Sequence, residues 1–109
     1  MRCSLVLLIA FVSIALVAGC QTSSSFAPAM VDARVVRAGA VGHADEKTLK
    51  AGRDLFTSRC IECHTLPPIS RYFASAWPSL VDKMARRADL KPYERNAIVA
   101  YIVAVRKTQ

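Results

Sequence analysis

The chain is short, has only one long apolar stretch and contains few histidines. Its 109 residues are too few for two independent cores. Apolar residues make up 53% of it, and many belong to one run, Leu5–Ala18, which is interrupted only by Ser13. A single run excludes a membrane protein with several spans, and the ordinary apolar content elsewhere excludes a chain that is disordered throughout. The two histidines, His43 and His64, limit the metal sites that the chain can build.

Residues 1–19 predict an export signal. Met1 and Arg2 provide a positive start, and the apolar run of about 14 residues is shorter than the roughly 20 that span a bilayer. The segment ends in Leu-Val-Ala-Gly-Cys at Leu16–Cys20, which resembles the lipobox of bacterial lipoproteins. This resemblance implies cleavage before Cys20, lipidation of Cys20 and attachment to a membrane through the lipid. Gln21, in place of the aspartate that retains such proteins in the inner membrane, favours the periplasmic face of the outer membrane. The alternative is an ordinary signal peptide with an incidental cysteine.

The rest of the chain divides into a tether and one domain. Residues 20–44 begin with small polar side chains and are interrupted by Pro28, Gly39 and Gly42, so we expect a flexible tether with at most a transient extended piece at Val31–Val36. Residues 45–109 are the expected domain. Export into an oxidising compartment would suggest two disulfides for four cysteines, but Cys3 leaves with the signal peptide and Cys20 takes the lipid.

The remaining cysteines form a motif for covalent haem attachment. They lie in Cys60-Ile61-Glu62-Cys63-His64, the C-x-x-C-H pattern of c-type haem. Thiols three residues apart share one side of a helical turn and can add to two vinyl groups on one porphyrin edge. His64 follows at once and is the predicted proximal iron ligand. We therefore expect one covalently bound haem c at Cys60, Cys63 and His64.

These cysteines have three other interpretations. A structural zinc site would need four ligands, and only His43, in the tether, could complete Cys60, Cys63 and His64. A thioredoxin-like redox pair would need a strand before the motif, whereas the preceding residues predict a helix. A chance occurrence of the pentapeptide is left to be judged from its surroundings.

Two helices are predicted around the motif. Asp45 can cap a helix that begins at Glu46 and runs into the motif, with its apolar face formed by Leu49, Gly52, Leu55 and Phe56. The pair Pro67-Pro68 should end the segment that carries His64. A second helix opens at Pro92 and Glu94, and its expected buried face consists of Ala97, Ile98, Tyr101, Ile102 and Val105.

From about Asp45 to Lys107 the chain resembles small bacterial class I cytochromes c. In that family a glycine and an aromatic on the first helix meet an aromatic on the last, and Gly52, Phe56 and Tyr101 match these places. The stretch Trp77–Met84 is similar to the family's tryptophan and methionine pattern. The resemblance implies an all-α, cytochrome c-like domain in which the amino-terminal and carboxy-terminal helices cross around one covalent haem.

Met84 is the expected sixth iron ligand. The resemblance places this methionine after the haem motif, where Met84 is the only candidate. The alternatives are a core methionine without an iron bond, and His43 as the ligand. By the same analogy, the loop with Pro67 and Pro68 should supply the carbonyl that accepts the other His64 ring proton. Trp77 either bonds a haem propionate or packs in the core.

The predicted function is one-electron transfer by a membrane-anchored, periplasmic monohaem protein with His64 and Met84 as axial ligands. Such a protein is not itself an enzyme, although it could be the haem subunit of a larger oxidoreductase. The alternative is a haem-based sensor or peroxidase-like protein with an open sixth site. Nucleic acid is not an expected partner. The basic side chains around Met84 predict docking of acidic redox partners, or else a solvated helix face or attraction to anionic lipid; they are Lys83, Arg86, Arg87 and Lys91.

Overall fold

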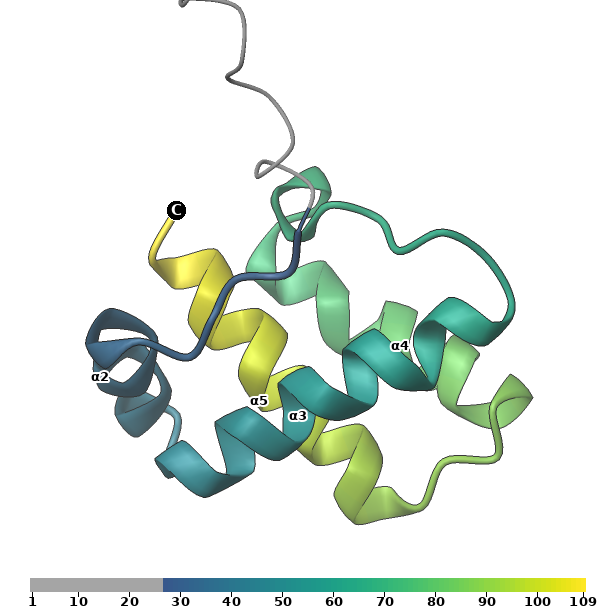
Figure 1. Cartoon of the computed structure of the whole chain (residues 1–109), viewed down its shortest axis with the longest axis horizontal. Helices are drawn as coiled ribbons and strands as arrows, with labels where there is room; N and C mark the ends of the chain where they lie inside the picture. The colour runs from purple at the N-terminus through teal and green to yellow at the C-terminus, as the bar shows by residue number, and fades with distance from the viewer. Residues whose placement is uncertain (1–26) are drawn as a thin grey trace, which may run out of the picture.

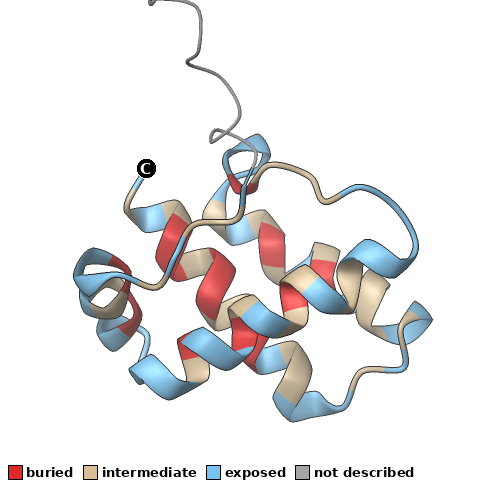
Figure 2. Cartoon of the chain, viewed as in Figure 1, coloured by how far each residue is buried: buried red, intermediate tan, exposed pale blue. Residues whose placement is uncertain are grey.

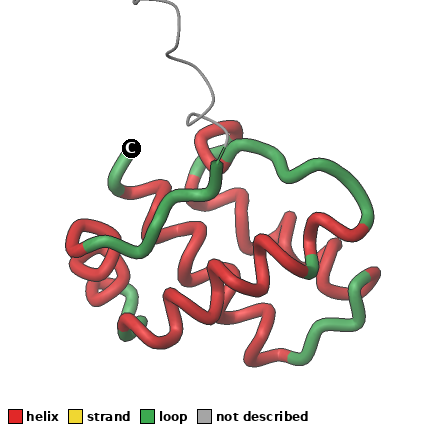
Figure 3. Tube along the Cα trace, in the orientation of Figure 1, coloured by secondary structure: helices red, strands yellow, loops and turns green. Residues whose placement is uncertain are grey.

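The computed structural model describes residues 27–109 as a bundle of four α-helices and three short 3₁₀ turns (Figure 1). The α-helices are α2 (Ala33–Val41), α3 (Glu46–Ser58), α4 (Trp77–Arg87) and α5 (Pro92–Lys107). The 3₁₀ turns are η1 (Cys60–Glu62), η2 (Ile69–Arg71) and η3 (Ala74–Ala76). The described part of the chain contains no strand, so the all-α prediction is confirmed (Figure 3). The predicted signal peptide and Cys20 lie outside the described residues.

The crossing of α3 over α5 is the most extensive contact between helices (Figure 1). Gly52 makes this crossing close, because a Cβ atom at that position would collide with the Ala97 carbonyl and lie 2.9 Å from Tyr101 Cβ. One turn later, the rings of Phe56 and Tyr101 meet with centroids 6.2 Å apart. Gly52, Phe56 and Tyr101 therefore come together as the sequence predicts.

Helix α5 forms the centre of the core (Figure 2). All five residues predicted for its apolar face are buried, and Ala104 is buried with them. On α3 the predicted face is buried at Leu49, Gly52 and Phe56, whereas Leu55 is only partly covered. The expected cap at Asp45 forms, since its carboxylate accepts the Thr48 N–H at 2.8 Å. Helix α5 has a cap as well, in which Glu94 accepts the Lys91 N–H at 2.8 Å.

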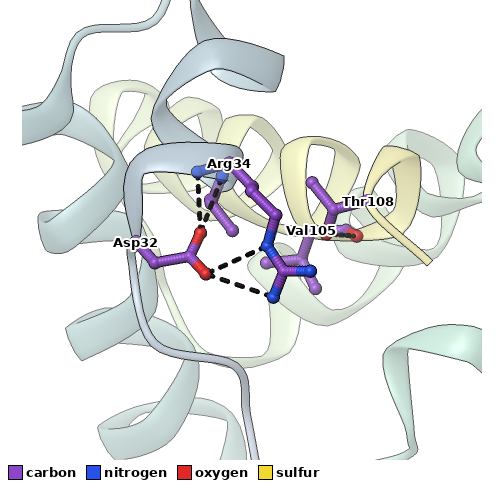
Figure 4. Close-up of polar contacts among 5 residues, drawn as sticks. Asp32, Arg34, Val105 and Thr108 are labelled. Carbon is purple, nitrogen blue, oxygen red and sulfur yellow. Dashed lines mark hydrogen bonds and ion pairs between the residues drawn. The ribbon is translucent and has the colours of Figure 1, made fainter.

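Residues 33–41 correct the prediction of a tether without persistent helix, because they form α2. The Asp32 carboxylate caps α2 by accepting the Arg34 and Val35 N–H groups, each at 2.9 Å (Figure 4). Val35 and Gly39 are buried where α2 packs on α5 and α3. The valines and Gly39 lower the intrinsic helix propensity of this segment, and the packing of α2 against α5 offsets that loss. The neglected signal was an N-cap aspartate followed by small and apolar residues at helical spacing.

The segment before α2 is also held on the bundle. The Ala29 carbonyl accepts a hydrogen bond from the Tyr101 hydroxyl at 2.6 Å and another from Arg53 Nε at 3.1 Å. Arg53 Nη2 also donates to the Pro28 carbonyl at 3.4 Å. The folded part of the chain therefore begins well before Asp45. No described helix is both long enough and apolar enough to cross a membrane.

Gly52→Ala should destabilise the protein. The added methyl group meets backbone rather than a flexible side chain, so the cost should be about 1–3 kcal/mol or more in the free energy of unfolding. Gly42→Ala is the matched control, because its nearest neighbouring atom would lie 3.5 Å away and its φ is −95°. That control should change the free energy of unfolding by about 1 kcal/mol or less. Urea denaturation measures both, and equal midpoints for the two variants would contradict the close crossing.

Tyr101 should make stability fall at high pH. Burial of the phenol raises the pKa of Tyr101 to about 12, against an ordinary value of about 10 in an unfolded chain. Between these values the folded state binds more protons than the unfolded state, so the free energy of unfolding decreases as pH rises through this window, and the contribution is complete below about pH 10. When it is measured by denaturation at pH values from about 9 to 12, the free energy of unfolding should fall more steeply with pH for the wild type than for Tyr101→Phe. The same pH dependence in both proteins would argue against the buried phenol.

Candidate functional site

Cys60 begins the 3₁₀ turn η1 directly after Arg59, the carboxy-terminal cap of α3, and Cys63 caps the end of that turn. The α-helix ends at Ser58, where the Thr57 and Ser58 hydroxyls donate to carbonyls of the preceding turn at 3.0 and 2.6 Å, a pattern that weakens helices. The helix therefore runs to the edge of the motif, as predicted, and the motif itself begins as a tighter turn. Residues three apart eclipse one another on a 3₁₀ turn, so the two thiols still lie on one side of the chain.

The two thiols differ in their surroundings. Neither is in a disulfide; Cys60 is partly buried and Cys63 is exposed. Burial raises the pKa of the Cys60 thiol, and the adjacent Arg59 guanidinium opposes this shift. Cys63 is therefore the more accessible thiol of the pair.

The exposed ring of His64 is held by one hydrogen bond. Its Nδ1 lies 2.8 Å from the Thr65 carbonyl oxygen. Because a carbonyl oxygen can only accept, Nδ1 is the donor in this contact, and in a neutral ring with this tautomer Nε2 has the lone pair that can bind a ligand. The expected backbone partner is present, but it belongs to Thr65 and not to the loop residues Pro67 or Pro68.

Met84 lies on the last turns of α4 and is partly buried. The structure brings it to the motif in two adjoining clefts, both of which are lined by His64 and Met84. The smaller, motif-side cleft has a volume of about 60 Å³ and is also lined by Cys60, Cys63 and Phe56, among others. The larger, loop-side cleft has a volume of about 480 Å³, which lies within the usual size range of ligand pockets. A histidine nitrogen, a thioether and two thiols thus border one hollow region of the molecule.

The loop that follows the motif lines the larger cleft with Thr65, Leu66, Pro67 and Pro68. Its end is anchored by Trp77, which is completely buried and donates its indole N–H to the Ile69 carbonyl at 3.1 Å. Tyr72 packs edge-on against Trp77, with ring centroids 5.5 Å apart. The indole proton is therefore engaged within the protein, which favours core packing over the propionate contact considered for Trp77.

Positive charge surrounds the two clefts. Arg59 and Arg87 line the smaller cleft and Arg71 lines the larger one, and none of the lining residues is acidic. The four predicted basic residues, Lys83, Arg86, Arg87 and Lys91, are all exposed. Arg59 and Arg71 had no signal in the sequence, because their position at the site depends on contacts between distant segments.

The alternative ligand His43 lies in the turn between α2 and α3 and lines neither cleft. Within residues 27–109, no group of three or more His, Cys, Asp and Glu side chains is arranged to hold a metal ion. Cys60, Cys63 and His64 therefore do not form the core of a zinc site in this arrangement.

Comparison with known proteins gives no significant match to a family model, to a curated protein or to a solved structure.

Trp77→Phe should loosen the wall of the larger cleft. The substitution leaves the buried Ile69 carbonyl without its donor, at a cost of about 1–3 kcal/mol in the free energy of unfolding. Phe73→Leu is the control, since that side chain is 79% exposed and its replacement should cost no more than about 0.5 kcal/mol. Denaturation followed by circular dichroism measures stability, and limited proteolysis should cut residues 65–69 faster in Trp77→Phe alone. Unchanged proteolysis would show that Trp77 does not anchor the loop.

Proposed function

We propose that this protein is a monohaem c-type cytochrome that carries single electrons. The observation that carries the proposal is the gathering of Cys60, Cys63, His64 and Met84 around adjoining clefts, although Met84 is 20 positions after His64 in sequence. Two thiols can hold a haem covalently, and an imidazole with a thioether can complete the coordination of its iron.

The surroundings of these residues suit such a group. The smaller cleft has apolar walls that include Phe56, Val81 and Ile98. The arginines at both clefts, without an acidic neighbour among the lining residues, suit a cofactor with two carboxylates. The bond from His64 Nδ1 to the Thr65 carbonyl leaves Nε2 available to iron and fixes the ring orientation.

The helix arrangement supports a cytochrome c-like domain. The resemblance noted in the sequence concerns Gly52 and Phe56 on one helix and Tyr101 on another, and these residues meet at the crossing of α3 and α5. The crossing places the end of α3, and the motif just after it, beside the clefts. In this proposal α3 and α5 are the scaffold, and α4 supplies the sixth ligand.

A bound haem would supply a reversible one-electron change between ferrous and ferric iron. The protein's own residues would keep the cofactor attached through Cys60 and Cys63, orient His64, and exclude water at the buried side with Phe56 and Ile98. A methionine ligand raises the reduction potential, so Met84 would favour the ferrous state. No substrate bond is made or broken.

Membrane attachment through Cys20 is part of the proposal. Residues 28 and 29 are hydrogen-bonded to the bundle, and Pro28 comes eight positions after Cys20. Even a fully extended chain of eight residues spans no more than about 29 Å, so the domain would stay close to the lipid surface. The exposed basic residues of α4 would then be available to acidic redox proteins.

The test is the spectrum and ligand binding of the protein made together with haem-attachment machinery. We expect a Soret band, a one-electron redox titration and little binding of carbon monoxide to the reduced protein, because Met84 occupies the sixth site. Met84→Ala should bind carbon monoxide promptly. Met30→Ala is the matched control: Met30 is 68% exposed, lines neither cleft and should leave binding unchanged.

Two outcomes would contradict the proposal in different ways. A colourless protein would exclude haem and favour a non-haem lipoprotein. A coloured wild type that binds carbon monoxide as fast as Met84→Ala would exclude stable methionine ligation and favour the sensor or peroxidase-like alternative.

A further inference from the structure

Arg59 connects the cysteine motif to the helix that carries Met84. It lies directly before Cys60, and its Nη2 donates a hydrogen bond to the Ala88 carbonyl at 2.7 Å, across 29 positions of sequence. Ala88 is the carboxy-terminal cap of α4, and its N–H donates to the Met84 carbonyl at 2.9 Å. One side chain thus joins the first haem-motif residue to the helical turn that contains Met84.

The opposite end of α4 is fixed by other contacts. Trp77 is bonded to the Ile69 carbonyl, and Arg95 of α5 pairs with Asp82 at 2.7 Å. Arg95 Nη2 also lies 3.5 Å from the Pro78 carbonyl. Among the hydrogen bonds of the described residues, the one from Arg59 alone joins the last turn of α4 to a distant segment.

The contact of Arg59 has the features of a strong hydrogen bond. The donor is charged, its side chain is 35% exposed, and the acceptor is a carbonyl at the negative end of a helix. The neighbouring Glu62 carboxylate is more distant, at 3.8 Å, and more exposed. Arg59 and Met84 also line the same motif-side cleft, so a movement of α4 would change the surroundings of both side chains.

We propose that Arg59 is a positioning residue that holds the Met84 thioether at the sixth site of the haem iron. The inference rests on the proposed function, because it concerns that function's sixth ligand. Without the bond to Ala88, the last turn of α4 would spend more time in positions where the thioether has left the iron. A ligand added from solution then competes with Met84 more easily.

The experiment measures imidazole binding to the oxidised, haem-loaded protein. Arg59→Met keeps a side chain of similar length and removes the donor and the charge, and we expect it to bind imidazole roughly 10- to 100-fold more tightly than the wild type. Arg59→Lys keeps the charge and one donor group, so its affinity should lie between the two. Arg86→Met is the matched control, because Arg86 is an exposed residue of the last turn of α4 that lines neither cleft, and its loss changes the charge equally.

The control separates position from charge. Arg86→Met should bind imidazole as the wild type does. Equal increases in Arg59→Met and Arg86→Met would assign the effect to charge and overturn the positioning role, as would wild-type affinity in both Arg59 variants. A lower urea midpoint without a change in imidazole affinity would show that Arg59 only stabilises the fold and would also overturn it.

Failure of the proposed function gives different results. A wild type that carries no haem would refute the cytochrome proposal itself. A wild type that binds imidazole as tightly as Met84→Ala would refute methionine ligation, and the role of Arg59 would fall with it. If Arg59→Met does not load haem, the positioning role is tested with Arg59→Lys instead. Its imidazole affinity must then exceed that of the wild type.

Discussion

The close crossing of α3 and α5 at Gly52 is the constraint on which the rest of the structure depends. With no side chain at this position, α3 reaches the Ala97 backbone, and the ring of Phe56 can then pack on Tyr101. Helix α3 ends six positions after this crossing, and Cys60 follows that end by two positions. A methyl group at the crossing would therefore disturb both the core and the position of the motif.

The site is assembled from segments that meet only through the bundle. α4 is attached to α5 by Arg95 and Asp82, to the loop by Trp77 and to the motif by Arg59. A small domain has a limited core, and its net stability is marginal. In the proposed function, covalent attachment of a haem would add a link between the motif and the helices around it and so stabilise a bundle of this size.

Local patterns in the sequence predicted the helices with clear caps and apolar faces, as at Asp45 and Pro92. The motif residues and Met84 were identified as site candidates, and the structure brings them to common clefts. The helix capped by Asp32 was missed because its low propensity is offset by packing on α5. Arg59 could not be found either, since its bond to Ala88 joins segments that only the fold brings together.

Covalent haem on the motif is tested most directly by the mass of the peptide that contains Cys60 and Cys63, measured after the purified protein has been denatured and digested. The peptide should carry the added mass of one haem, and a variant with serine at both positions should carry none. An unmodified peptide from the wild type, or haem released by denaturation alone, would contradict attachment through the two thiols.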